Sequence, residues 1–340
     1  MGRNGIDPFA LGLQVILWYP AMTTLYRSLP MLWFAWATTV TAEELPKLAK
    51  PGTYRLTTVS GGFERTAHIH IPKSYDSKTP LPLVLGLHGG GGSGERFLID
   101  NGWADLAEAK GAIIASPDGL PANPKQKPNF KTNPPFWNCG QLPAISPRSK
   151  IDDVAYFVAM LDELAERVKF DPKRVFVAGH SMGGGMAFRF AELKSERVAA
   201  IATVAGVVSS SEPKPKKPVP TLYIHGSKDP ILPPDGGEVK LPWGKRTSKP
   251  VSDNLAIWTK AIEAEATATD VSNQKDLKIV EYKPKKSGAK LMVITIEGHG
   301  HAWPGGKSHG LPESILGPIT EKLDATKRIW EFFEDVSAKR

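Results

Sequence analysis

The sequence contains one cysteine, Cys139, among 340 residues. A single cysteine excludes an internal disulfide and a zinc cluster of the Cys-x-x-Cys type. We interpret Cys139 as a buried or half-buried thiol rather than a nucleophile, because a serine lies in a better context for that role. His68 and His70 alternate onto one face of an expected strand, which is typical of the wet side of a half-buried sheet. We predict no metal and no cofactor.

Long hydrophobic runs are also scarce. The apolar run at residues 29–37 is short and interrupted by a proline, which argues against a membrane span. Arg27 precedes this run and Val40-Thr41-Ala42 follows it, so we predict that residues 1–42 are a secretory signal cleaved after Ala42. We interpret Met22 as the true start and residues 1–21 as the product of a misplaced start codon. The alternative is an N-terminal membrane anchor. With either a signal or an anchor, the rest of the protein is expected to be exported, that is, secreted or periplasmic. Cleavage of a signal would leave no stable membrane span.

Proteins that bind single-stranded nucleic acid place aromatic residues among their basic ones. The basic residues of this chain are not interleaved with aromatic residues in that way. Its net charge is +8, yet the lysines fall in short, proline-mixed runs such as residues 214–217 and 283–286. Runs of this kind are typical of solvated loops. We predict no nucleic-acid partner, and no feature of the sequence sets an oligomeric state.

Apolar patterning predicts the order of secondary structure. Residues 53–60 and 65–71 alternate on either side of two glycines, which indicates a hairpin. Continuous apolar runs then alternate with helical patterns, which predicts a mostly parallel central sheet with helices on both faces. Residues 43–340 are expected to form one domain. The expected strands are 81–87, 112–115, 174–178, 199–204, 221–224 and 291–296, and the expected helices are 152–168, 182–193, 254–264 and 321–336.

Residues 118–150 form a long segment rich in proline, asparagine and lysine. A structureless segment of this length within a compact domain is usually functional or mobile. We predict that it lies near the site as a wall or a lid. Asp152 and Asp153, which follow it, stand at a helix start, where capping is the default interpretation.

The strongest chemical signal is Gly179-His180-Ser181-Met182-Gly183, which follows a buried strand and opens a helix. This is the context of a nucleophile elbow, in which the tight turn requires glycine on either side. The helix N-terminus behind the serine also favours negative charge. We predict that Ser181 is the nucleophile, and a tight turn without chemistry is the alternative.

The second signal is the run His88-Gly89-Gly90-Gly91-Gly92-Ser93-Gly94, directly after the first buried parallel strand. Consecutive glycines leave backbone N–H groups bare, and such donors stabilise the oxyanion of a tetrahedral intermediate. We predict the N–H groups of Gly90 and Met182 for this role. A phosphate-binding loop is disfavoured because no Lys-Ser/Thr follows. The alternative without a catalytic role is that the glycines only make a flexible turn.

A serine nucleophile also needs an acid and a base, in the chain order Ser, Asp, His. Asp229 follows the late strand at 221–224 and is our choice of acid, with Asp235 as a rival. The acid holds the imidazole in one tautomer and stabilises the imidazolium. His299 and His301 both follow the last strand, and spacing alone leaves the choice of base open.

From about Gly52 to Phe333 the chain resembles the secreted polyhydroxybutyrate depolymerase and feruloyl esterase group of α/β-hydrolases. The resemblance implies the α/β-hydrolase fold, Asp229 as the acid, and His301 as the base because it precedes an x-Trp-Pro motif. Two departures concern the substrate: Cys139 has no partner cysteine, and the insert at 236–249, with Trp243, is longer than usual and is expected to reshape the pocket. The motifs, in order, are Leu87-His88-Gly89, Trp137-Asn138-Cys139-Gly140, Ile151-Asp152-Asp153-Val154, Asp171-Pro172-Lys173-Arg174-Val175, the serine elbow, His225-Gly226 to Asp229-Pro230, His301-Ala302-Trp303-Pro304-Gly305, and Asp324-Ala325-Thr326 leading to Ile329-Trp330-Glu331-Phe332-Phe333.

We therefore expect an exported serine esterase that works through an acyl-enzyme on an ester substrate, with a polyhydroxybutyrate-type polyester or oligomer as first choice. Feruloyl or acetyl esters of plant polysaccharide are the alternative, and a peptidase is less favoured. An inactive hydrolase-fold binding protein is the alternative from another class. Trp303, Trp137 and His180 are candidate substrate contacts, and the bland alternative for each tryptophan is support of a loop.

Overall fold

The computed structural model describes residues 48, 50–241, 244–307 and 311–338. They belong to one compact unit, Leu45–Arg340. The predicted signal segment, residues 1–42, and Trp243 lie outside the described residues.

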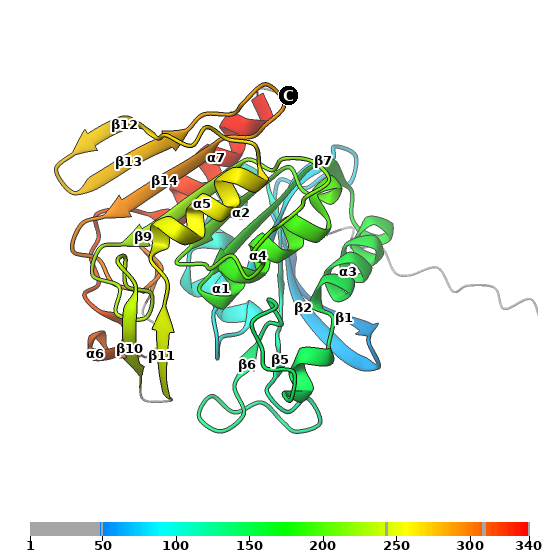
Figure 1. Ribbon diagram of the computed structural model, residues 1–340. Coiled ribbons are helices and arrows are strands. Elements are labelled where there is room, and N and C mark those ends of the chain that lie inside the picture. The colour runs from blue at the N-terminus through cyan, green and yellow to red at the C-terminus, as the bar shows by residue number, and fades with distance from the viewer. Residues whose placement is uncertain (1–47, 49, 242–243, 308–310, 339–340) are drawn as a thin grey trace, which may run out of the picture. The chain divides into compact units, whose positions relative to one another are not determined.

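The centre of this unit is a ten-stranded sheet in the order β1-β2-β4-β3-β7-β8-β9-β14-β13-β12 (Figure 1). Strands β4, β3, β7, β8, β9 and β14 run parallel, and antiparallel strands flank them at both ends. The predicted mostly parallel sheet and the predicted first hairpin are confirmed. The strands are β1 (Gly52–Ser60), β2 (Phe63–Ile71), β3 (Leu81–Leu87), β4 (Ile113–Pro117), β7 (Phe170–His180), β8 (Ala200–Val204), β9 (Thr221–Gly226), β12 (Thr269–Gln274), β13 (Leu277–Tyr282) and β14 (Leu291–Ile296).

Helices cover both faces of the sheet, as predicted (Figure 1). Helices α3 (Asp153–Arg167), α4 (Met182–Leu193) and α5 (Val251–Ala261) pack on one face, and α1 (Gly94–Asp100), α2 (Trp103–Lys110) and α7 (Ala325–Ala338) pack on the other. Strand β3 supplies both layers, because Leu83 and Leu85 point into the first core and Val84 into the second. A strand buried on both faces explains its unbroken apolar run.

Several elements escaped the sequence prediction. Helix α1 has seven residues, too few for a clear helical period, and it begins directly in the glycine-rich loop. Strand β12 reads Thr-Asp-Val-Ser-Asn-Gln and carries little apolar signal. The 236–249 insert forms the hairpin of β10 (Gly237–Leu241) and β11 (Gly244–Ser248). The remaining elements are β5 (Leu120–Pro121), β6 (Pro135–Phe136), α6 (Glu313–Leu316) and two 3-10 turns, η1 (Pro147–Lys150) and η2 (Ser195–Arg197).

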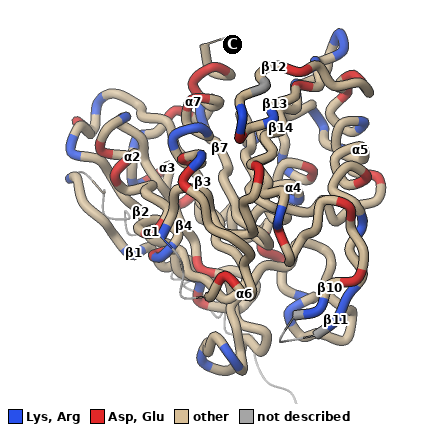
Figure 2. Tube along the Cα trace, turned by 90° about the vertical axis from the view of Figure 1, so that its left-hand side faces the viewer, with Lys and Arg blue, Asp and Glu red and all other residues tan. Residues whose placement is uncertain are grey.

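Two properties of the structure concern contact with membranes and with charged partners. Every helix in the part of the chain that the structure describes falls short of the length and apolarity needed to cross a bilayer. On the side shown in Figure 2, basic and acidic residues are interspersed along the helices and turns.

Candidate active site

Ser181 occupies the turn between β7 and α4, where its backbone has φ 52° and ψ −116°. A positive φ lies on the left-handed side of the Ramachandran map, which residues other than glycine rarely adopt. Such strained residues are often found at functional sites. A Cβ added at Gly179 would lie 2.2 Å from the Gly183 carbonyl oxygen, and one at Gly183 would lie 2.2 Å from the Leu87 carbonyl oxygen. Both flanking glycines are therefore steric requirements of the turn.

His301, in the loop after β14, lies next to Ser181. Its Nε2 is 2.9 Å from Ser181 Oγ, and its Nδ1 is 2.7 Å from Asp229 Oδ2. An ionised carboxylate only accepts hydrogen bonds, so the proton sits on Nδ1, and Nε2 is left as the acceptor facing the serine hydroxyl. The three side chains come from loops at the carboxyl ends of β7, β9 and β14, which lie at one edge of the sheet.

Asp229 is held as a carboxylate. It is 2% exposed, and its Oδ1 accepts hydrogen bonds from the backbone N–H groups of Ile231 and Leu232, each at 2.8 Å. Burial raises its pKa, but His301 and the two N–H donors more than offset this, so the pKa lies below its usual range.

The rival residues lie elsewhere. Both ring nitrogens of His299 are engaged: Nδ1 accepts from the Thr320 N–H at 3.1 Å and Nε2 donates to the Ala302 carbonyl at 3.0 Å. Burial lowers the pKa of His299, which keeps the ring neutral. Asp235 is exposed. His299 therefore braces the loop that carries His301.

Two backbone donors border Ser181. A Cβ added at Gly89 would lie 3.4 Å from Ser181 Cβ, and one at Gly90 would lie 3.2 Å from Met182 Sδ. In the described part of the chain, the Gly90 N–H meets no acceptor, whereas the next N–H, of Gly91, donates to the Pro135 carbonyl at 2.7 Å. The Met182 N–H begins helix α4, where N–H groups have no partner within the helix and no side chain caps them.

Trp137 and Trp303, expected to touch substrate, are both buried. Trp137 is 0% exposed and its Nε1 donates to the His88 carbonyl, and Trp303 is 2% exposed and its Nε1 donates to Thr326 Oγ1. A buried ring offers no face for stacking, so the expectation of a substrate platform is contradicted for both. Each supports a loop of the site instead.

His180 was also expected to touch substrate, and the structure assigns it a different place. It is 7% exposed, and its Nε2 donates to the His301 backbone carbonyl at 2.7 Å. The two histidine rings are 5.2 Å apart between centroids. His180 therefore holds the backbone of His301 from within, rather than lining the opening.

The default interpretation of Asp153 as a capping residue is wrong. Asp152 makes the cap of α3, because its Oδ1 accepts from the N–H groups of Val154 and Ala155. Asp153 is buried and pairs with two buried arginines, with Oδ1 2.8 Å from Arg65 Nη2 and Oδ2 2.5 Å from Arg148 Nη2. No local pattern links residues 65, 148 and 153, so this cluster could not be predicted from the sequence.

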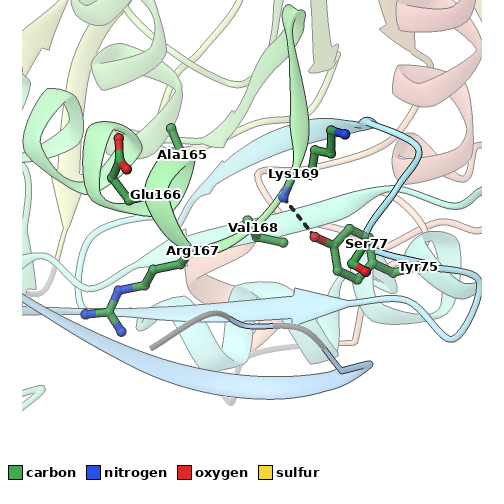
Figure 3. A pocket seen from close by; sticks show the side chains of 7 residues that line it. All are labelled: Tyr75, Ser77, Ala165, Glu166, Arg167, Val168 and Lys169. Carbon is green, nitrogen blue, oxygen red and sulfur yellow. Dashed lines mark hydrogen bonds between the residues drawn. The ribbon is translucent and has the colours of Figure 1, made fainter. Parts of the chain in front are cut away.

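One pocket of the described residues is remote from Ser181. It measures about 400 Å³, and Figure 3 shows its lining of Tyr75, Ser77 and residues 165–169, with the Lys169 N–H donating to Tyr75 Oη. Lys169 precedes β7 and Ser181 follows it, so the length of the strand, about 35 Å at ~3.3 Å per residue, separates them. Among the described residues, no three His, Cys, Asp or Glu side chains form a group that could hold a metal ion.

The sheet, its helices and a serine at a strand-to-helix turn define an α/β-hydrolase. Residues 59–281 match the Esterase family, described as "Putative esterase", and the chain belongs to that family. It is therefore a carboxylic ester hydrolase.

Individual relatives agree with the family. The chain is 29% identical over 266 residues to "Putative esterase NocK" of Nocardia uniformis subsp. tsuyamanensis, covering 74% of this chain and 73% of that protein. It is 28% identical over 249 residues to feruloyl esterase B of Piromyces equi, covering 72% of this chain but 44% of that protein. An acetyl xylan esterase structure from Aspergillus awamori shares the fold, with a TM-score of 0.54, 15% identity, and coverage of 83% of this chain and 99% of that one.

Proposed function

We propose that the chain hydrolyses carboxylic esters with Ser181 as nucleophile, His301 as general base and Asp229 as the acid that orients it. The observation that carries the proposal is the continuous chain of hydrogen bonds from Ser181 Oγ to His301 at 2.9 Å and from His301 to Asp229 at 2.7 Å. A nucleophile within hydrogen-bond reach of a base, itself oriented by a third group, is the arrangement that activates a serine.

The reaction runs through an acyl-enzyme. Ser181 Oγ attacks the ester carbonyl and passes its proton to His301 Nε2, while Asp229 stabilises the imidazolium. The N–H groups of Gly90 and Met182 stabilise the oxyanion. His301 then protonates the departing alcohol, and a water activated by His301 releases the acid and restores Ser181.

The substrate is an acid ester carried on plant polysaccharide, of the feruloyl or acetyl type. The activities named for similar proteins support this choice, among them feruloyl esterase B and the bifunctional acetylxylan esterase/xylanase XynS20E of Neocallimastix patriciarum, to which this chain is 24% identical over 171 residues. Export through residues 1–42 suits such a polymer, which an enzyme meets outside the cell. The polyester substrate expected from the sequence motifs is the second candidate.

Product release from three polymers tests both parts of the proposal. Feruloylated arabinoxylan, acetylated xylan and poly(3-hydroxybutyrate) are incubated separately with the full chain, and free ferulate, acetate and hydroxybutyrate are quantified. We expect ferulate or acetate, and a loss of about 10⁴-fold or more in turnover for Ser181→Ala. Ser74→Ala, an exposed serine before the amino end of β3, is the matched control and keeps full turnover.

The outcomes separate mechanism from substrate. A folded Ser181→Ala protein with full turnover would refute the serine mechanism. Hydroxybutyrate as the sole product, lost in Ser181→Ala, would keep the mechanism and replace the substrate by a polyester. Wild-type protein that is folded but releases none of the three products would favour the inactive binding protein.

A further inference from the structure

One exposed aromatic side chain reaches the glycine loop beside Ser181. Phe130 lies in the tip formed by residues 123–133, within the 118–150 segment. A Cβ added at Gly91 would lie 2.6 Å from Phe130 Cε2 and 2.8 Å from its Cδ2, so the phenyl ring occupies the space of a side chain at position 91. Gly91 is adjacent to Gly90, whose N–H we assign to the oxyanion. The ring thus belongs to the surroundings of the reacting carbonyl.

Phe130 is 51% exposed. Among the described residues, the other large hydrophobic side chains with such exposure are aliphatic, namely Val59, Ile99, Ile145, Leu193 and Val271. A single exposed hydrophobic residue is ordinary on a protein surface. What distinguishes Phe130 is its position, since one part of the ring packs against the glycine loop and the rest remains open to a ligand.

The tip that carries Phe130 is hydrogen-bonded from within by Asn133, which is 6% exposed. Its Nδ2 donates to the carbonyls of Asn123 at 3.1 Å and Lys127 at 3.0 Å, and its Oδ1 accepts from the Asn123 N–H at 2.8 Å. The backbones of Asn129 and Asn133 also exchange two hydrogen bonds, at 2.8 and 2.9 Å. These bonds order the backbone that carries Phe130, so binding costs less loss of backbone freedom.

The base of the tip is fixed to the glycine loop and to the core. The Gly91 N–H donates to the Pro135 carbonyl at 2.7 Å, and Arg148 Nη2 donates to the Phe136 carbonyl at 2.9 Å. Arg148 in turn pairs with the buried Asp153. Phe130 and the proposed oxyanion donor Gly90 are therefore parts of one hydrogen-bonded assembly.

We propose that Phe130 determines acyl specificity by packing its open face against the planar ring of an aromatic acyl group while that group is bound at Ser181. The proposal rests on the function proposed above and adds the substrate contact that Trp137 and Trp303 do not provide. Offset or edge-to-face aromatic pairs are favourable beyond the apolar area they bury. A short aliphatic acyl group has no planar ring for such a contact.

The test compares two methyl esters that share a leaving group, methyl ferulate and methyl butyrate, by titrating released acid. For Phe130→Ala we expect kcat/KM on methyl ferulate to fall about tenfold, mainly through KM, and kcat/KM on methyl butyrate to change less than twofold. Phe130→Trp restores the preference for methyl ferulate, because it restores an aromatic face. Ile145→Ala is the matched control, since Ile145 is 93% exposed in the same segment, and it leaves both esters unaffected.

Two results would overturn the proposal. One is an equal loss on both esters, which means that Phe130 only supports the glycine loop. The other is a kcat/KM on methyl ferulate that is unchanged in Phe130→Ala. Each is distinct from failure of the proposed function, which appears as turnover that survives Ser181→Ala on either ester.

Discussion

Two carboxylates of this molecule, Asp229 and Asp153, are equally buried but have different partners and different consequences. Both use each oxygen for hydrogen bonds, and both are almost completely removed from solvent, at 2% and 1% exposed. Asp229 faces one histidine and two backbone N–H groups, whereas Asp153 faces two arginines and the Asn138 N–H. The two carboxylates therefore differ in their hydrogen-bonding partners and not in their burial.

The difference lies in whether a proton can move. An imidazole can take up and release a proton, and His301 connects Asp229 to a half-buried serine hydroxyl. An arginine keeps its proton, so Asp153 only holds charge. Burial lowers the pKa of Arg148, with Asp153 opposing that shift, and the Arg65 guanidinium also lies 4.0 Å from the centre of the Tyr156 ring. A buried ion pair of this kind fixes the 118–150 segment, whereas the Asp229 chain can support chemistry.

Removing the charge of Asp229 is expected to give the larger effect on rate. In Asp229→Asn the amide favours the wrong imidazole tautomer, so kcat should fall by about 10⁴-fold, with a smaller loss of melting temperature than in Asp153→Asn. Initial rates on methyl ferulate and thermal denaturation measure the two quantities. Asp235→Asn, an exposed acid a few residues away, is the control and should behave as wild type. A loss below tenfold for Asp229→Asn would contradict its assigned role.

Removing the charge of Asp153 should affect stability more than the catalytic rate. Asp153→Asn leaves two buried guanidinium groups without their counterion, so the free energy of unfolding should fall by about 3–5 kcal/mol. Urea denaturation at neutral pH measures it. The remaining folded protein, assayed at low temperature, should keep kcat within about tenfold of wild type. Asp152→Asn is the matched control, because asparagine caps a helix as well as aspartate does. Stability equal to that of the control would show that the cluster is not needed.

Asp118, at the start of the same segment, is a third and less buried carboxylate that sharpens the comparison. It accepts from Thr66 Oγ1 at 2.7 Å and the Gly94 N–H at 2.7 Å, and lies 3.3 Å from His68 Nε2. Burial raises its pKa, but these partners more than offset that and bring the pKa to about 2. A carboxylate with a depressed pKa stabilises the fold above its unfolded pKa, and this contribution is lost as the pH falls towards 2.

Asp118→Asn is therefore expected to lower the free energy of unfolding by about 2 kcal/mol at pH 6, and the difference from wild type should shrink between pH 4 and pH 2. The bond to Asp118 also raises the pKa of His68, so part of the stabilisation should fade as the pH rises through that pKa. Urea denaturation at several pH values measures both the loss of stabilisation at low pH and its loss as the pH rises through the pKa of His68. Asp105→Asn, an exposed position on α2, is the control. A difference from wild type that stays constant with pH would exclude the ionisation of Asp118 as its source.

What the sequence alone could predict follows from the range of the interactions. The alternating pattern of 53–71 and the unbroken run of 81–87 predict their strands, because side-chain period and burial are properties of consecutive residues. The elbow at Ser181 is equally local, since its glycines are required by contacts within the turn and with one adjacent strand. The weakly apolar β12 and the short α1 were missed because neither carries a clear period.

The choice among chemically similar residues needed the tertiary structure. His301 and His299 are two residues apart, and only the packing of the loop decides which ring meets Ser181 and which meets Thr320. Trp137 and Phe130 lie in one segment, yet the first is 0% and the second 51% exposed. The sequence by itself determined the parallel sheet and its serine turn, because short-range sterics and apolar period act along the chain. The fold decided the orientation of side chains over the site, because those orientations depend on contacts between residues tens of positions apart.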